Sequence, residues 1–220
     1  MGGTGYKIKK GRTLIGGTGY DISFGTPLSA YSEGGIVKIN ESGSPVEFYV
    51  SKHDYESALN GTGRTLLVRE SIYDDRQWHS SNMNRWAECS LLVWLNEDYK
   101  NLLDSNIQGL IGETSYYYTI GGGNSNVSIR SDSVFLLSMA ELGQEAVAAN
   151  KEGTALPISE ILSKLIRTQW TRTPNITDRY KAYGVSYGSL RNSNVGYTYG
   201  SRPVFTLPST TIVGADGVIR

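Results

Sequence analysis

The sequence is poor in the residues that build disulfide-linked or metal-bound scaffolds. Its 220 residues include one cysteine, Cys89, and two histidines, His53 and His79. A single cysteine excludes a disulfide framework within the chain and any CxxC motif. Two histidines beside it are too few for the usual zinc ligand sets. We therefore expect no metal and no cofactor.

Net charge and long apolar runs are lacking as well. Twenty-one Lys and Arg balance 21 Asp and Glu, which argues against nucleic acid or an anionic membrane as a partner of the whole chain. No stretch approaches the ~20 apolar residues of a membrane span. The opening MGGTGYKIKK has no apolar core of a secretory signal. We expect a protein made in a reducing compartment, with no nucleic-acid or membrane partner.

Glycine and tyrosine are abundant instead. The chain has 26 Gly and 15 Tyr but only 4 Phe, and its glycine share exceeds the roughly 7 % of an average protein. This composition favours many short strands joined by turns. It is also typical of contact surfaces built from rigid, amphipathic rings.

A 14-residue repeat occupies the N-terminus, where GGTGYKI at 2–8 recurs as GGTGYDI at 16–22. Glycine turns followed by alternating apolar residues predict small β-hairpins. Two repeats need another surface to lie on, so residues 1–30 are either an assembly arm or a hairpin of the domain formed by 31–220. The candidate assembly residues are Gly3, Tyr6, Ile8, Leu14, Gly17, Tyr20 and Ile22.

The rest of the chain predicts an α+β domain. Alternating apolar residues bounded by Gly, Ser and Asn predict strands at 36–40, 46–51, 64–70, 181–190, 195–200 and 202–208. Helical spacing predicts helices at 90–103, with a break near Asn96, at 106–111 and at 157–167. Residues 133–143 predict a buried strand that runs into a helix, because Ser138 and Glu141 form a capping-box pattern and Gly143 suits a helix end.

Four motifs occur in an order that resembles the DUF6273 domain family. They are SLLVWLN at 90–96, VFLLSMAEL at 134–142, QWTRTP at 169–174 and SRPVFTL at 201–207. Arg172 occupies the arginine position of the third motif. Val93, where the family often has arginine, and the threonines at 171 and 173 depart from the pattern.

The resemblance implies a C-type-lectin-like fold, as in formylglycine-generating enzymes and variable phage receptor-binding proteins. The N-terminal repeats resemble those of structural proteins from phages of Gram-positive bacteria. The implied function is a non-enzymatic virion-surface protein, either a capsid decoration protein or a tail fibre or baseplate protein. Its partners would be other virion proteins and a host glycan or protein. Two alternatives are a bacterial cell-surface adhesin and a formylglycine-generating-type oxidoreductase, against which the lone cysteine argues.

No residue pattern predicts catalysis. Neither histidine lies in a triad motif, and the adjacent Asp74 and Asp75 are typical of a solvated loop. Cys89, among apolar residues, is best interpreted as a small buried side chain. A calcium site in the asparagine-rich 121–128 is a weak alternative, because no Asp-x-Asp-x-Asn-Gly loop is present.

The segment 170–202 is the candidate binding surface, because it combines tyrosine, arginine and asparagine with a single acid, Asp178. Tyrosine and arginine are frequent at binding hot spots. Buried tyrosines filling one face of a sheet are the alternative for Tyr183 and Tyr187. The predicted ligand-binding residues are Trp170, Arg172, Tyr183, Tyr187, Arg191, Asn192, Asn194, Tyr197 and Tyr199. An acidic stretch at 70–120 and a basic one at 160–220 suit head-to-tail packing in a homo-oligomer, which we expect, although solvated faces without partners explain the asymmetry as simply.

Overall fold

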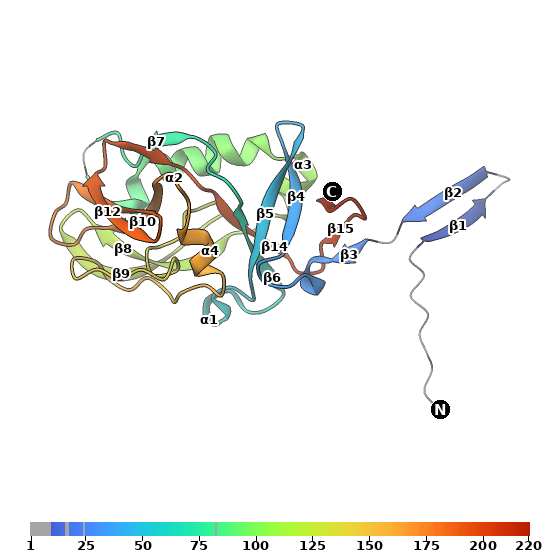
Figure 1. Ribbon diagram of the computed structural model, residues 1–220, viewed down its shortest axis with the longest axis horizontal. Coiled ribbons are helices and arrows are strands. Elements are labelled where there is room, and N and C mark those ends of the chain that lie inside the picture. The colour runs from blue at the N-terminus through green and yellow to red at the C-terminus, as the bar shows by residue number, and fades with distance from the viewer. Residues whose placement is uncertain (1–9, 16–17, 24, 82) are drawn as a thin grey trace, which may run out of the picture.

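The computed structural model describes residues 10–15, 18–23, 25–81 and 83–220, and their fold is mostly β (Figure 1). Strands account for 39 % and helices for 17 % of the structure. The strands form a seven-stranded sheet, a five-stranded sheet and two two-stranded ribbons. The helices are single turns or little more, so the α+β class holds with β strongly dominant.

The seven-stranded sheet has the order β14-β6-β5-β4-β16-β15-β3. Its strands are β3 (Thr26–Pro27), β4 (Ile36–Glu41), β5 (Ser44–His53), β6 (Arg64–Arg69), β14 (Val204–Pro208), β15 (Ile212–Val213) and β16 (Val218–Ile219). The β4–β5 hairpin turns through Ser42 and Gly43, both with positive φ, as a two-residue hairpin of this twist requires. Alternate side chains of β4 and β5 are buried, and Phe48 packs on Phe205 of β14 at 5.4 Å between ring centroids.

The five-stranded sheet has the order β12-β11-β10-β13-β7. It contains β7 (Asp75–Gln77), β10 (Gln169–Pro174), β11 (Lys181–Ser186), β12 (Ser189–Asn194) and β13 (Thr198–Gly200). Only β10 and β13 pair in parallel; the other neighbours are antiparallel. Strands β12 and β7 are its two edges.

A separate ribbon pairs β8 (Thr114–Gly121) with β9 (Asn124–Asp132). The chain reverses at Gly122 and Gly123, again with positive φ at both residues. Asn84 holds this turn, because its side-chain oxygen accepts a hydrogen bond from Gly122 N–H at 2.7 Å. The two-stranded sheet β1 (Lys10–Ile15) with β2 (Thr18–Ser23) is drawn apart from the main body in Figure 1.

The helical elements are short. They are η1 (Leu28–Ala30), α1 (Ser57–Asn60), η2 (Trp86–Glu88), α2 (Ser90–Trp94), η3 (Leu95–Tyr99), η4 (Lys100–Leu102), α3 (Ser105–Leu110) and α4 (Ser159–Ser163). The predicted helix at 90–103 is continuous in direction but changes from α to π geometry at Leu95. Asn96 is the reason for the break, because its amide donates to the backbone oxygens of both Leu92 and Val134.

The predicted helix after residue 138 is wrong. Ser138 and Glu141 do make the reciprocal capping bonds: Glu141 Oε2 accepts from Ser138 N–H at 2.8 Å, and Ser138 Oγ accepts from Glu141 N–H at 3.1 Å. They close a turn that ends at Gly143, φ 70°. No apolar stripe follows to extend it, so the local bonds form without a helix.

The prediction of a C-type-lectin-like fold is also wrong. The structure is mostly β, with few helices, and the predicted helix at 157–167 is reduced to the five residues of α4. The motifs behind that prediction are present: SLLVWLN forms α2 and the start of η3, VFLLSMAEL an isolated bridge and a turn, and the other two contain β10 and β14. The main body also starts earlier than residue 31, since β3 and η1 already belong to the seven-stranded sheet and its core.

Candidate binding surface

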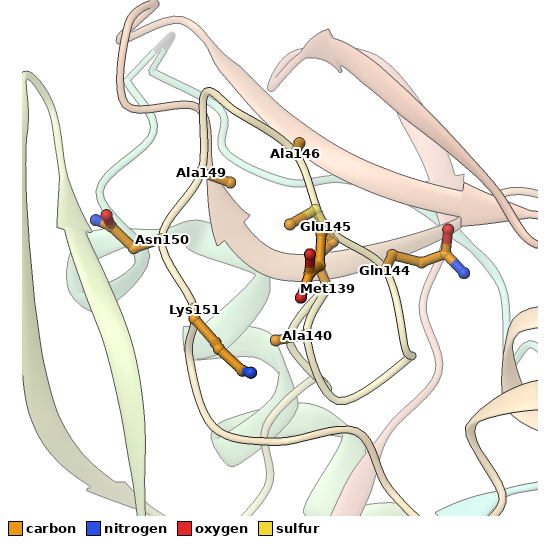
Figure 2. Close-up of a pocket in the computed structure, with 8 residues that line it drawn as sticks. All are labelled: Met139, Ala140, Gln144, Glu145, Ala146, Ala149, Asn150 and Lys151. Carbon is orange, nitrogen blue, oxygen red and sulfur yellow. The ribbon is translucent and has the colours of Figure 1, made fainter.

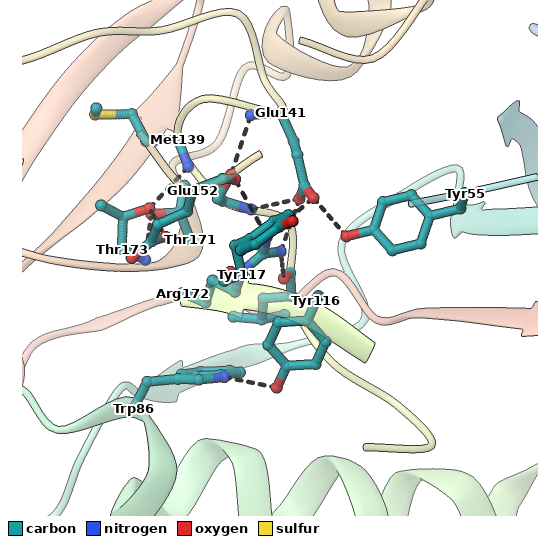
Figure 3. Close-up of polar contacts among 12 residues, drawn as sticks. Tyr55, Trp86, Tyr116, Tyr117, Met139, Glu141, Glu152, Thr171, Arg172 and Thr173 are labelled. Atoms are coloured by element: carbon teal, nitrogen blue, oxygen red, sulfur yellow. Dashed lines mark hydrogen bonds and ion pairs between the residues drawn. The ribbon is translucent and has the colours of Figure 1, made fainter. Parts of the chain in front are cut away.

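The interior beneath the predicted site is held by an ion pair (Figure 3). Arg172 on β10 donates to Glu141 through two parallel bonds of 2.7 and 2.9 Å, and both side chains are fully buried. The guanidinium also donates to the backbone oxygens of Tyr117 and Leu136 and lies 4.8 Å from the centre of the Tyr116 ring. Burial lowers the pKa of Arg172, but Glu141, Tyr55 and Glu152 together outweigh this, so its pKa is raised. Arg172 therefore holds neighbouring segments of the interior together and cannot contact a ligand at the surface.

A second buried acid, Glu152, lies beside this pair. Its carboxylate accepts from Thr119 N–H at 2.6 Å and from the Thr173 hydroxyl at 2.7 Å. Burial raises its pKa, although Arg172 and the two donors oppose the shift. The network fastens the loop 138–158 to β8 and β10, and this loop supplies the residues that line the pocket shown in Figure 2.

Trp170 and Tyr183 are buried as well. Trp170 is 1 % exposed, and its indole donates to Arg76 O at 2.9 Å. Tyr183 is 4 % exposed, with its phenol near the Asn175 amide. For Tyr183 the alternative of a ring filling the buried face of the sheet is therefore correct. Three of the nine predicted ligand-binding side chains thus lie in the interior, because β10 and β11 are inner strands of their sheet.

The remaining six lie on or just after the edge hairpin. Tyr187, Arg191, Asn192 and Tyr197 are exposed, while Asn194 and Tyr199 are half-buried. Tyr187 and Tyr197 are 64 % and 62 % exposed and stand at opposite ends of β12. Tyr199 instead packs on Trp170 at 4.5 Å and hydrogen-bonds Ser193 at 2.6 Å. The structure therefore places Arg191 and Asn192 on the exposed edge strand, with Tyr187 in the turn before it and Tyr197 in the segment after it.

The hairpin tip holds Tyr187 in an unusual conformation. Tyr187 has φ 48° and Gly188 φ 68°, which is a two-residue turn between Ser186 and Ser189. For a residue with a side chain this left-handed conformation costs roughly 1–2 kcal/mol. The backbone is tied down by N–H bonds from Tyr187 to Leu165 O and from Gly188 to Ser163 O, both 2.9 Å. A fixed backbone thus presents an exposed ring.

A pocket of about 270 Å³ lies at the opposite edge of the same sheet. Its walls come from β7, α2 and β13, and are Asp75, Arg76, Gln77, Ser90, Leu91, Trp94 and Thr198. The Arg76 guanidinium lies 3.6 Å from the centre of the Trp94 ring and is fixed by Asp74 at 2.8 Å. Thr198 directly follows the exposed Tyr197 in the chain, but β11 and β10 separate β12 from the strands that line the pocket. Sequence analysis missed this pocket, because neither Arg76 nor Trp94 carries a recognisable motif.

A smaller pocket of about 240 Å³ opens on the loop that the buried network fastens (Figure 2). Met139, Ala140, Ala146 and Ala149 form its apolar lining. Gln144, Glu145, Asn150 and Lys151 are its polar residues, and all lie on the single loop 138–158. It is therefore a hollow of one loop, not a site where several elements converge.

The two histidines, which are the candidate catalytic bases, make hydrogen bonds within the fold. His53 Nε2 donates to Tyr31 O at 2.8 Å, so Nδ1 accepts from Thr65 at 2.8 Å. His79 Nδ1 accepts from Ser90 N–H, which leaves the proton of the neutral ring on Nε2, facing Ser81. That tautomer cannot take the proton of Ser81, and burial lowers the pKa of His79. In the described part of the chain, no group of three His, Cys, Asp or Glu is placed to hold a metal ion.

Asp75, Cys89 and the predicted assembly residues lie in different parts of the chain. Asp75 pairs with Arg167, and Cys89 is fully buried with its sulfur accepting from Leu92 N–H. Among the assembly residues, Leu14, Tyr20 and Ile22 lie in β1 and β2. Gly3, Tyr6, Ile8 and Gly17 lie outside the described residues.

Comparison with known proteins gives one family. The model of DUF6273, a domain of unknown function, matches residues 62–209 and includes all four motifs noted in the sequence. No curated protein and no solved structure matches the chain. Among the residues that the structure describes, no helix has the length and apolarity to cross a membrane. Because the match covers more than half of the sequence, the chain belongs to the DUF6273 family.

Proposed function

We propose that the protein is a non-enzymatic structural protein of a phage virion that binds a host glycan or protein through the exposed edge of its five-stranded sheet. The binding surface consists of Tyr187, Arg191, Asn192 and Tyr197, and the Arg76–Trp94 pocket at the opposite edge of the same sheet is a second ligand site. The N-terminal segment, with its repeat and the β1–β2 hairpin, would join the domain to a capsid or tail protein. The phage origin rests on the resemblance of the repeats alone.

The conformation of Tyr187 carries the binding proposal. Glycine or asparagine would relieve the left-handed backbone at this position, and the ring, 64 % exposed, gains little from packing. A bulky ring kept where folding disfavours it points to a role outside folding. Tyrosine has few rotatable bonds, and the anchored turn reduces the entropy lost on binding.

The pocket around Trp94 favours a saccharide as one ligand class. Its Arg76, Asp75 and Gln77 provide planar polar groups, while Trp94, Ser90 and Thr198 provide an aromatic edge and hydroxyls. Such a mixture of a few polar groups around an apolar wall is typical of small-molecule sites. Paired catalytic carboxylates are not a competing interpretation here, because Asp74 and Asp75 each hold an arginine.

The test of binding compares two variants on intact host cells and on glycan arrays. Arg191→Ala with Tyr197→Ala should abolish binding without lowering the melting temperature, since both side chains are exposed. Thr210→Ala, exposed outside the surface, is the matched control and should bind as the wild type does. Unchanged binding by the double variant would refute the surface.

The virion proposal has a separate test. Purified particles should contain the chain by mass spectrometry, and antibody labelling in electron microscopy should place it on head or tail. Its absence from particles would refute the structural role, even if the surface binds a ligand.

A further inference from the structure

The strand β9 is a long edge with exposed apolar residues. Within the part of the chain that the structure describes, β9 pairs with β8 on one side and with no strand on the other. Figure 1 shows it along the margin of the main body. Val127 is 42 % and Ile129 52 % exposed, on the same face as Tyr117, which lies opposite Ile129. An unpaired edge of this kind is a template for pairing with another strand.

The usual protections of an edge are weak in β9 after Val127, whereas its pairing with β8 is irregular between Asn124 and Val127, where the register shifts. Its sequence, NSNVSIRSD, contains no proline and no lysine. Its two charges neutralise each other, since Arg130 Nε and Nη2 donate to Asp132 at 2.6 and 2.9 Å. Another segment bonds the start of the strand, where the Asn150 amide donates to Ser125 O.

We propose that β9 pairs antiparallel with β9 of a second copy, about a twofold axis through Ser128, to form a homodimer with a continuous four-stranded sheet. The strand is complementary to itself in this register. Val127 lies opposite the partner's Ile129, and Ile129 opposite the partner's Val127. A row of side chains then crosses the whole sheet from Tyr117 and Ile129 to the partner's Val127 and the partner's Thr119.

The polar positions match in the same register. Asn126 lies opposite the partner's Arg130, so no like charges meet beside the apolar pairs. A register shifted by one residue turns the apolar side chains to opposite faces. A shift by two residues in one direction places Val127 opposite the partner's Ser131. A shift by two in the other direction places Ile129 opposite the partner's Ser125. The twofold register through Ser128 is therefore favoured, and the contact is isologous and closed, not head-to-tail.

Disulfide trapping tests both the dimer and its register. In Ser128→Cys the two thiols face each other, with Cα atoms about 4.5–5.5 Å apart, within the 4.4–6.8 Å of a disulfide. In Ser131→Cys, the matched control on the same strand, the two Cα atoms are about 20 Å apart at ~3.4 Å per residue. Mild oxidation should link Ser128→Cys into a covalent dimer and leave Ser131→Cys unlinked. Equal linking of both, or of neither, would overturn the proposed register.

Sedimentation of the full chain tests the dimer without a new thiol. The wild type should pass from monomer to dimer over a dilution series. Val127→Lys with Ile129→Lys should stay monomeric with an unchanged melting temperature, because both side chains are exposed. Arg191→Ala, on β12 of the five-stranded sheet, should dimerise normally. A wild type that is monomeric at every concentration would overturn the proposal and leave the ligand-binding surface untouched.

Discussion

Arg172 and Glu141 meet in the interior through two parallel hydrogen bonds, with neither side chain exposed. Arg172→Met would leave the Glu141 carboxylate buried without its cation, at a cost of about 3–5 kcal/mol in the free energy of unfolding. Arg172→Met with Glu141→Gln removes both charges and should cost less than Arg172→Met alone. Denaturant unfolding of both variants measures this coupling. Additive losses would show that the two residues act independently.

Glu152 should make stability depend on pH. Burial raises its folded pKa above the ordinary value of about 4.3 for an unfolded chain. Between these two pKa values the folded state binds more protons, so this contribution is present at low pH and is lost as pH rises. The free energy of unfolding of the wild type minus that of Glu152→Gln should therefore fall from about pH 4 upward and level off above the folded pKa. A difference that grows with pH would contradict the raised pKa.

Gly121 and Gly123 should respond very differently to alanine. Both have positive φ, 76° and 93°. A Cβ at Gly121 would lie 1.9 Å from Asn84 O, whereas nothing lies within 4 Å of one at Gly123. Gly123→Ala should cost only the roughly 1–2 kcal/mol of the backbone conformation. Gly121→Ala should cost clearly more, as measured by thermal or denaturant unfolding, and similar losses for both would be inconsistent with this close approach.

Cys89 should be inert in the native protein. The side chain is fully buried, and burial raises the pKa of its thiol well above the usual range. An aromatic disulfide reagent should therefore show no reaction under native conditions and one thiol per chain in guanidinium chloride. Rapid native labelling would contradict the burial. The same inertness keeps Cys89 silent in the trapping experiment on β9.

Strand prediction worked where alternation was strong. The strands at 36–40, 46–51 and 64–70 correspond to β4, β5 and β6, and 202–208 contains β14. Each combines β-branched or aromatic residues with clear turn signals. The predicted helix after Ser138 does not form, because a capping box specifies only one turn. The apolar residues around it are buried in the core without lying on a helix. Local patterns thus predicted the local bonds but not the element.

The site was predicted only in part, for a reason that the Arg172 position shows. An arginine between threonines looks alike in sequence whether it is exposed or buried; its partner Glu141 is distant along the chain and belongs to a turn. The edge position of β12 depends on sheet order, which the sequence does not display. The predicted exposure of Arg191 is confirmed, and Tyr187 is exposed as well. Both belong to one hairpin, whose turn and strand are adjacent in sequence and therefore also in the fold.

The C-terminal residues determine how mechanical load enters the domain. They form β15 and β16, which lie between β3 and β4 in the seven-stranded sheet. The backbone of Leu28 and Ser29 also bonds to Thr211 and Ser209, each at 2.8 Å. A pull on the chain before Thr26 therefore reaches these last residues first. All of β15 and β16 lies beyond the family match, as do β3, β4 and β5 before it, so the anchoring of the domain against force depends on segments that the family pattern does not include.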